Sequence, residues 1–381
     1  MTEYTDVQKQ RLNKFLEFLV TNGGSDLHVK AGSHIRGRIH GEIVKLSDSI
    51  LSKEDALDLA KELLRGRFDE LIREKSVDFT YKLNDRYRFR TNVFFQIDGI
   101  SIVLRTITVD IPTMEQLKLP PTIKKICDET ERGIILLTGP TGSGKTTTIA
   151  SMIDYINERR TSHIVTIEDP VEFVFRDKNC IINQRSLGQD CNTFADSLRA
   201  ALREDPDIIF VGEMRDLITI ETAMNAAETG HLVLSTLHTV DAKETLGRII
   251  GMFEVNEQNR IRQTLAAVLE AVISQRLVKT TDGKRTAAVE ILRKNTRIRD
   301  MILDHRDGEI VDAIKEGRRT YGMQTFDQHL LELYQNGVIT RDEALIKSTT
   351  RGDLEIMIKN EILARQGADS LNEDVIELKE I

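Results

Sequence analysis

The segment GPTGSGKT, residues 139–146, constrains the fold of this chain more than any other feature. It satisfies the pattern G-x-x-x-x-G-K-[ST], with an apolar run before it (Ile134–Thr138) and apolar residues at helical spacing after it (149–156). Glycines in such a loop let backbone N–H groups turn toward phosphate oxygens, and the N-terminus of the following helix adds its positive end. A strand, a phosphate-binding loop and a helix in this order predict an α/β nucleotide-binding domain.

The predicted nucleotide-binding residues are those of this loop and of the first turn of the helix. Lys145 is expected to reach the β- and γ-phosphates, and the Thr146 hydroxyl is expected to ligate Mg²⁺. The full set is Gly139, Pro140, Thr141, Gly142, Ser143, Gly144, Lys145, Thr146 and Thr147. Kinases, GTPases, helicases and motors all use a loop of this kind, so residues elsewhere have to distinguish them.

Acidic residues end two further apolar runs. HIVTIEDP reaches Glu168, and DIIFVGEMRD reaches Glu213 directly after Gly212. An additional strand between the phosphate loop and the second acid is the arrangement of RecA-like and AAA-like ATPases, where acids at strand ends face the γ-phosphate. ATP is therefore the expected nucleotide. Glu213 is predicted to orient the attacking water or to hold Mg²⁺ through a water, and Glu168 competes with it for the role of general base.

Two histidines flank the next apolar run, in TGHLVLSTLHT. In a regular strand, residues seven positions apart point to opposite faces and lie about 23 Å apart, so His231 and His238 are not expected to form a metal pair. His238, at the C-terminal end, is placed to sense or bond the γ-phosphate. His231, at the start of the run, is expected to be structural.

The predicted secondary structure changes in kind along the rest of the chain. An opening helix is predicted to end at Gly23, and residues 26–107 read as short strands broken by one helix over 53–71, with Asp98 and Gly99 in a tight hairpin turn. After a stretch with three prolines, apolar strands alternate with helices, which indicates a parallel sheet, and from residue 256 the pattern is mostly helical. The expected divisions are residues 1–108, a linker at 109–121, an ATPase core at 122–290 and a helical C-terminal region at 291–381.

Composition limits the partners and the compartment. The 381 residues include 53 Lys and Arg against 61 Asp and Glu, a net charge of −8, which argues against a protein that coats nucleic acid. The 3 cysteines are too few for a disulfide framework. No apolar stretch reaches the roughly 18 residues of a membrane span, and the N-terminal residues are polar. We expect a cytoplasmic protein without a membrane span, which reaches a membrane only through a partner.

Four motifs follow one another in the order GPTGSGKTTT, TIEDPVEF, ALREDPDIIFVGEMRD and AAETGHLVLSTLHT. They resemble the Walker A motif, Asp box, Walker B motif and His box of the secretion ATPase superfamily. SDLHVKAG, YRFRTNVFFQIDGISIVLRTI and GMQTFDQHLLELYQNGVITRDEAL extend the resemblance, over nearly the whole chain, to the type IV pilus retraction ATPases of the PilT and PilU types. The matching positions are Lys145 and Thr146 (Walker A), Glu168 (Asp box), Glu213 (Walker B), and His231 and His238 (His box).

The resemblance implies a PAS-like N-terminal α+β domain and a RecA-like P-loop ATPase domain with a helical C-terminal region. It also implies a ring-shaped homo-hexamer that uses ATP and Mg²⁺ to power pilus disassembly, and hence twitching motility, at the periphery of the inner membrane. The partners it implies are an inner-membrane pilus platform protein and a second retraction ATPase. No nucleic acid is expected among them.

Arginines alternate with aromatic residues in the segment RYRFR, residues 86–90. A strand would place the three guanidinium groups on one face, where a solvated or salt-bridged surface is one interpretation. The other is that some of them, with Arg105 on the returning strand, reach the phosphates of a neighbouring subunit, a role that suits a permanently charged, bidentate group. We favour Arg90 and Arg105 for that role.

Three alternatives remain for the function. Pilus extension and type II secretion ATPases typically carry an additional N-terminal domain and a four-cysteine zinc insertion, whereas this chain has 3 cysteines, none closely paired. A RecA-type nucleic-acid translocase would need a basic channel, and a non-hydrolysing regulator would not need acids at both strand ends. Retraction ATPases typically carry the segment AIRNLIRE, but this chain has RIRDMILD, which leaves open whether it retracts pili alone or assists another motor.

Overall fold

The computed structural model describes residues 2–84, 86–107 and 110–361. It divides into two compact units. The first contains Met1–Ile111, Ile167–Arg176 and Gln184–Thr193, and the second contains Pro112–Thr166, Asp177–Asn183 and Phe194–Ile381.

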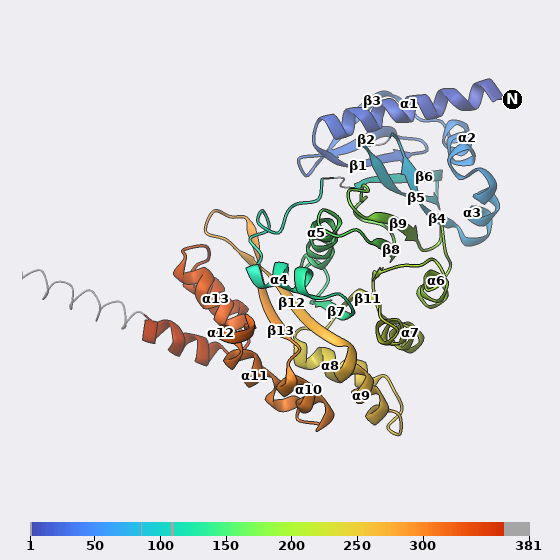
Figure 1. Cartoon of the computed structure of the whole chain (residues 1–381). Helices are drawn as coiled ribbons and strands as arrows, with labels where there is room; N and C mark the ends of the chain where they lie inside the picture. The colour runs from blue at the N-terminus through green and yellow to red at the C-terminus, as the bar shows by residue number, and fades with distance from the viewer. Residues whose placement is uncertain (1, 85, 108–109, 362–381) are drawn as a thin grey trace, which may run out of the picture. The chain divides into compact units, whose positions relative to one another are not determined.

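A six-stranded sheet in the order β3-β2-β1-β6-β5-β4 forms the centre of the first unit, and each strand pairs with its neighbours in the antiparallel direction. Its strands are β1 (Gly24–Lys30), β2 (His34–Ile39), β3 (Glu42–Ile50), β4 (Ser76–Lys82), β5 (Arg88–Gln96) and β6 (Gly99–Ile107). Helices α1 (Thr2–Thr21) and α2 (Lys53–Leu64) pack against it (Figure 1). Leu12, Leu16 and Leu19 of α1 are buried with Leu27 and Phe89 of the sheet. The α+β organisation predicted for this part of the chain is confirmed.

Two local predictions in this unit need correction. The single helix predicted over residues 53–71 is broken, because Arg65 has a positive φ of 47° and the segment Arg65–Arg67 forms a 3-10 turn before α3 (Phe68–Glu74). Gly66 in the middle of that turn weakens a continuous helix. The second prediction places Asp98 and Gly99 in the turn of the β5–β6 hairpin. Gln96 pairs with Gly99, so the two residues between the strands are Ile97 and Asp98. Gly99 has a positive φ of 126°, whereas Asp98 does not have a positive φ.

A seven-stranded sheet in the order β13-β12-β7-β11-β10-β8-β9 runs through the second unit. The strands are β7 (Gly133–Thr138), β8 (His163–Glu168), β9 (Ile181–Ser186), β10 (Ile208–Val211), β11 (Leu232–Leu237), β12 (Leu269–Lys279) and β13 (Arg285–Arg293). Strands β10, β11, β7 and β12 pair in parallel, whereas β13 is antiparallel to β12. The predicted parallel sheet is confirmed, and its continuous apolar strands are fully buried, as expected when helices cover both faces.

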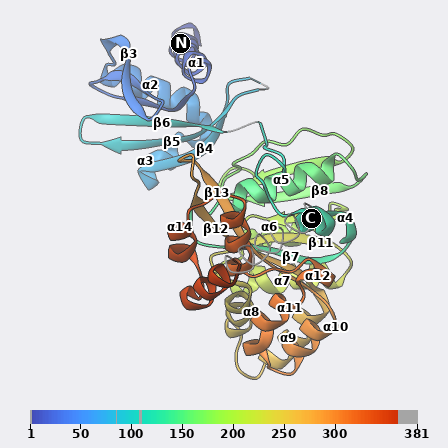
Figure 2. The ribbon, with the colours of Figure 1, turned by 90° about the vertical axis from the view of Figure 1, so that its left-hand side faces the viewer.

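Helices connect and cover these strands. They are α4 (Pro121–Glu129), α5 (Lys145–Asn157), α6 (Phe194–Ala201), α7 (Leu217–Glu228), α8 (Ala242–Gly251), α9 (Gln258–Val268), α10 (Thr296–Leu303), α11 (Ile310–Glu316), α12 (Arg318–Tyr321), α13 (Phe326–Gln335) and α14 (Arg341–Lys347). Helices α8 to α11 form one contiguous layer, and α8 and α11 contact the β12–β13 hairpin (Figure 2). Thr340 caps α14 by accepting a hydrogen bond from the Glu343 N–H.

The prediction of a mostly helical chain from residue 256 onward is wrong for residues 269–293. These residues form β12 and β13, which extend the parallel sheet beyond β7. A short apolar run such as Ala271–Ile273 fits a buried strand as well as a buried helix, and pairing with a distant strand decides between them. The sheet therefore reaches past residue 290, to Arg293.

A buried carboxyl group joins β13 to the start of α8. Glu290 is 4% exposed, and its Oε1 atom accepts a hydrogen bond of 2.9 Å from the backbone N–H of Ala242. Burial raises the pKa of Glu290 to about 7, although this hydrogen bond opposes the rise. Glu290 therefore gains a proton in the folded protein at a pH where an ordinary glutamate is ionised.

We predict that Glu290→Gln stabilises the protein at pH 8. A carboxyl whose pKa is higher when folded contributes stability at low pH and loses it as the pH rises from about 4.5 toward 7. Glutamine keeps the acceptor for Ala242 and cannot ionise, so the gain should reach the order of 2 kcal/mol at pH 8 and vanish near pH 4.5. Thermal melting across this range measures it, with the exposed Glu254→Gln as control. An equal gain at both ends of the range would contradict the prediction.

Candidate nucleotide site

The loop between β7 and α5 has a backbone that only glycine adopts easily. Gly139, Gly142 and Gly144 have φ angles of 144°, 78° and 89°. A Cβ atom on Gly139 would lie 2.4 Å from the backbone oxygen of Gln275, and a Cβ on Gly144 would lie 2.8 Å from the Gln275 Nε2 atom. At Gly139 and Gly144, a larger residue would therefore be disfavoured both by the positive φ and by the clash of its Cβ atom with Gln275.

Lys145 begins α5 and folds back over the loop. Its side chain is largely buried, and its Nζ atom donates hydrogen bonds to the carbonyl oxygens of Gly139 at 2.6 Å and Pro140 at 3.1 Å. Thr146 and Thr147 follow in the first helical turn, where both are half-buried. The loop thus places a positive charge and the N-terminus of a helix next to each other, which is the arrangement that binds phosphate.

Strand β12 holds this loop from one side, which the sequence reasoning missed. Gln275 is 3% exposed, and its Nε2 atom donates a hydrogen bond of 2.7 Å to the Ser143 carbonyl oxygen. Its Oε1 atom accepts a hydrogen bond of 2.8 Å from the Thr148 hydroxyl of α5. The polar pair Ser274–Gln275 inside the apolar run AVISQRLV was the only sequence signal of this contact.

Glu213 lies just beyond the end of β10, held by groups from neighbouring residues. Its Oε2 atom is 2.7 Å from an Arg215 guanidinium nitrogen, and its Oε1 atom is 3.2 Å from His238 Nε2. Thr236 of β11 donates a hydrogen bond of 2.6 Å to the carbonyl of Gly212, which fixes the backbone before the acid. Partial burial raises the pKa of Glu213, but the hydrogen bond from Arg215 and the charges of His238 and Arg215 outweigh it, so the pKa lies below its usual value. The carboxylate is ionised at neutral pH.

His238 connects this acid to the phosphate loop, whereas His231 does not. His238 Nδ1 lies 3.5 Å from the Thr141 hydroxyl, on the side of the ring opposite the Glu213 contact. His231 lies before β11, where its Nδ1 atom is 2.9 Å from the Ala226 carbonyl oxygen and so ties the end of α7 to the sheet. The structure thus brings together three of the predicted residues, from three different loops, and separates His231 from them.

Glu168 ends β8 and belongs to the first compact unit. It is 5% exposed, and its Oε1 atom accepts a hydrogen bond of 3.1 Å from Gln184 Nε2. Gln184 also donates to the Phe173 carbonyl oxygen at 2.8 Å and accepts from the Phe175 N–H at 2.8 Å, so its amide has a fixed orientation. Gln184 was not predicted, and it sets the direction of the Glu168 carboxylate.

The two arginines favoured for a trans role face each other across β5 and β6. Arg90 and Arg105 are register partners in the first unit. Arg105 Nε lies 2.7 Å from Asp26 Oδ1, although the arginine side chain remains 68% exposed. Burial alone would raise the pKa of Asp26, but hydrogen bonds from Ser25 and Arg105 have the larger combined effect. The pKa of Asp26 therefore lies below its usual value, and this acid stays charged. Arg105 thus forms an ion pair within this unit, Arg90 is exposed, and the trans role of the two arginines stays a prediction.

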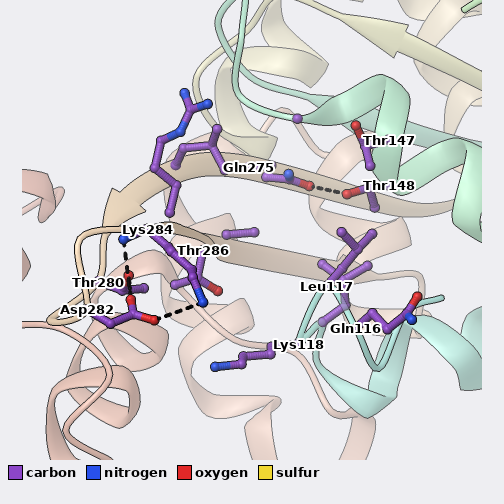
Figure 3. A pocket seen from close by; sticks show the side chains of 15 residues that line it. Gln116, Leu117, Lys118, Thr147, Thr148, Gln275, Thr280, Asp282, Lys284 and Thr286 are labelled. Atoms are coloured by element: carbon purple, nitrogen blue, oxygen red, sulfur yellow. Dashed lines mark hydrogen bonds and ion pairs between the residues drawn. The ribbon is translucent and has the colours of Figure 1, made fainter. Parts of the chain in front are cut away.

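A cavity of about 550 Å³ lies beside the first turn of α5. Thr147, Thr148 and Gln275 line it near the loop, as Figure 3 shows. Across from them are the β12–β13 turn, where Thr280 and Asp282 contact each other, and the segment 116–119. This volume is in the range of small-molecule pockets. The cavity continues directly from the phosphate loop, because Gly144 also lines it.

Comparison with known proteins now adds to this geometry. The model of the type II/IV secretion system protein family matches residues 3–373. The chain belongs to this family. The resemblance inferred from the four motifs is thereby confirmed, and the protein is an ATPase with a P-loop fold.

Relatives within the family resemble the chain over most of its length. It is 41% identical over 341 residues to the type IV pilus retraction ATPase PilT of Pseudomonas aeruginosa, covering 88% of this chain and 98% of the relative. It is 38% identical to the type IV pilus ATPase PilU of the same organism, covering 91% of each. A crystal structure of the pilus retraction motor PilT with bound ADP is 43% identical, with a TM-score of 0.83 over 90% of this chain and 98% of that one.

A second solved structure, the ATPase DotB of Legionella pneumophila, is 30% identical, with a TM-score of 0.78 over 88% of this chain and 94% of that one. The fold class predicted from the sequence is confirmed by these two structures. Within the described residues, no helix is both long enough and apolar enough to cross a membrane.

Proposed function

We propose that this ATPase is a motor that drives the retraction of type IV pili. The observation that carries the proposal is the joint placement of a phosphate loop, His238 and Glu213 in a chain that matches the retraction ATPase PilT along 98% of that protein's length. The geometry supports hydrolysis, and the likeness to PilT supports the mechanical task.

The phosphate loop is proposed to bind ATP through its backbone N–H groups and Lys145. The lysine is already positioned by Gly139 and Pro140, at the N-terminus of α5. The donor set also fits Mg²⁺, because Thr146 offers a hydroxyl in the first turn and Glu213 is ionised. When bound, Mg²⁺ neutralises charge on the β- and γ-phosphates. Thr146 would hold it directly, and Glu213 would hold it through a water.

We assign the catalytic work to Glu213, Glu168 and His238. An ionised Glu213 that is hydrogen-bonded to Arg215 suits the orientation of the attacking water, and Glu168, fixed by Gln184, is the competing general base. His238 contacts both Thr141 of the loop and Glu213. A shift of the loop when the γ-phosphate binds or leaves would therefore change the contact between His238 and Glu213. His231 is assigned a structural role.

The cavity shown in Figure 3 is proposed to receive the nucleoside part of ATP. It opens from Gly144 and Thr147, next to the loop that takes the phosphates. Its walls combine apolar groups such as Leu117 and Leu277 with hydroxyl and amide groups and with four charged side chains, Lys118, Asp282, Lys284 and Arg285. Such a mixture suits a purine ring and a ribose.

The remaining proposals concern assembly. A homo-hexamer would let Arg90 and Arg105 reach the phosphates of a neighbouring subunit, with Arg105 exchanging or sharing its contact with Asp26. The motor would work in the cytoplasm at the periphery of the inner membrane, on a pilus platform protein, and a PilU-like or PilT-like second ATPase is a further partner. The comparable likeness to PilT and PilU, 41% and 38%, supports retraction without choosing between a lone and an accessory motor.

Glu213→Gln is expected to bind ATP normally and to hydrolyse it at least 100-fold more slowly, because an amide can neither accept a proton nor hold the water as a carboxylate does. Lys145→Ala should lose nucleotide binding as well. Phosphate release and binding of a fluorescent ATP analogue separate the two effects. Glu228→Gln, an exposed acid at the other end of α7, is the matched control. Wild-type turnover in Glu213→Gln would remove this residue from the mechanism.

Deletion of the gene in its host is expected to give cells with more surface pili that no longer twitch. The reason is that assembled pili persist when the motor that disassembles them is missing. Pilus counts by electron microscopy and twitching zones on agar measure both effects, with the wild-type gene and Glu213→Gln supplied in trans. Bald cells would contradict retraction and indicate extension. Normal twitching and piliation would contradict a role as the sole retraction motor.

A further inference from the structure

Gln275 contacts the backbone of the phosphate loop directly, through a hydrogen bond to the Ser143 carbonyl oxygen. It lies on β12, the neighbour of β7, where Ser274 pairs with Thr138 at the end of the strand that leads into the loop. Its amide is buried between the loop and α5, as Figure 3 shows for its contact with Thr148.

The orientation of the amide is set by its partners. The Ser143 carbonyl oxygen can only accept a hydrogen bond, so the Gln275 Nε2 atom must face it, at 2.7 Å. The opposite end, Oε1, then accepts from the Thr148 hydroxyl at 2.8 Å. A rotation of the amide by half a turn would place two acceptors against each other. The contact therefore has one stable arrangement.

This contact also fixes a donor of the loop. The Ser143–Gly144 peptide is planar and trans, so its C=O and N–H groups point in opposite directions. With the carbonyl of Ser143 directed at Gln275, the N–H of Gly144 must point away from β12. Gly144 has a φ of 89°, in the left-handed region that glycine adopts without strain, so the loop can hold this orientation of the peptide.

We propose that Gln275 is a positioning residue for the nucleotide: by holding the Ser143 carbonyl it aims the Gly144 N–H at the bound phosphates. This inference deepens the proposed function, because it rests on the loop being the site that binds ATP. Gln275 acts on the phosphates through the loop, although its side chain also lines the cavity proposed for the nucleoside. A donor that is aimed before binding costs no reorganisation when the phosphate arrives.

The test compares two buried glutamines in the full chain. Gln275→Leu removes the contact with the loop, and Gln324→Leu removes a similar amide, whose Nε2 atom donates to the Val289 carbonyl oxygen at 2.9 Å. Both variants should melt at lower temperature. Only Gln275→Leu should weaken the binding of fluorescent ADP, by roughly 10-fold, the usual effect of one lost hydrogen bond. Its KM for ATP should rise by a similar factor, with a smaller change in kcat.

A double-mutant cycle with Thr148→Val measures the ADP affinity of each single variant and of the double variant. If Gln275 only stabilised the fold, these substitutions would not change the ADP affinity of the folded protein. Thr148→Val alone frees the amide and should weaken ADP binding less than Gln275→Leu does. In the Gln275→Leu background it should add nothing, because its partner is gone. Additive effects on affinity would overturn the proposal, as would wild-type ADP affinity in a folded Gln275→Leu. If that variant does not fold, Gln275→Met, of similar length, takes its place.

Lys145→Ala separates this inference from the proposed function. If wild-type protein binds ADP, and Lys145→Ala does not, the loop is the nucleotide site, and the Gln275 series then tests positioning alone. If wild-type protein binds ADP and Lys145→Ala binds it equally well, the site is elsewhere, and both the assignment of the loop and the inference about Gln275 are overturned.

Discussion

The parallel pairing of β7 with β11 on one side and β12 on the other is the constraint on which the site depends. It ends β7 at Thr138 and brings the following loop to the same edge of the sheet as the ends of its neighbours. The loop contains three glycines with positive φ, so contacts from the neighbouring strands help to fix its shape. Gln275 from one neighbour and His238 from the other supply those contacts.

Charge is arranged around this loop in two layers. Lys145 lies across the loop itself, where its Nζ atom donates hydrogen bonds to the carbonyl oxygens of Gly139 and Pro140. Glu213 is farther along the same edge and is balanced by Arg215, which keeps it ionised despite partial burial. A negative group that is already paired repels incoming phosphates less than a bare one would. A carboxylate balanced in this way can lie near an anion-binding loop at a smaller electrostatic cost than an unpaired carboxylate.

The sequence alone predicted the parts of this site that are local or that follow the strand-end rule. The loop from Gly139 to Thr146 is a continuous motif, and acids or histidines just after apolar runs, such as Glu213 and His238, must lie at one edge of a parallel sheet. Gln275 could not be predicted in this way, because its partner Ser143 is 132 residues distant and the pairing of β12 with β7 depends on the whole sheet. For the same reason the pattern over residues 269–293 predicts helix, although these residues form β12 and β13. The break at Arg65 was missed because one left-handed residue leaves no periodic pattern.

Strand β12 contacts more than the phosphate loop. Adjacent residues of a strand point to opposite faces, and Arg276, next to Gln275, is directed toward the C-terminal helices. Its guanidinium lies 3.8 Å from the centre of the Phe326 ring in α13 and donates a hydrogen bond of 2.9 Å to the Lys347 carbonyl oxygen at the end of α14. Any shift of β12 that follows a change in the loop must therefore move or break contacts on both faces. A motor has to convert a small change at a phosphate into a larger displacement elsewhere. Strand β12 is suited to couple the two, because it contacts the phosphate loop through one face and the C-terminal helices through the other.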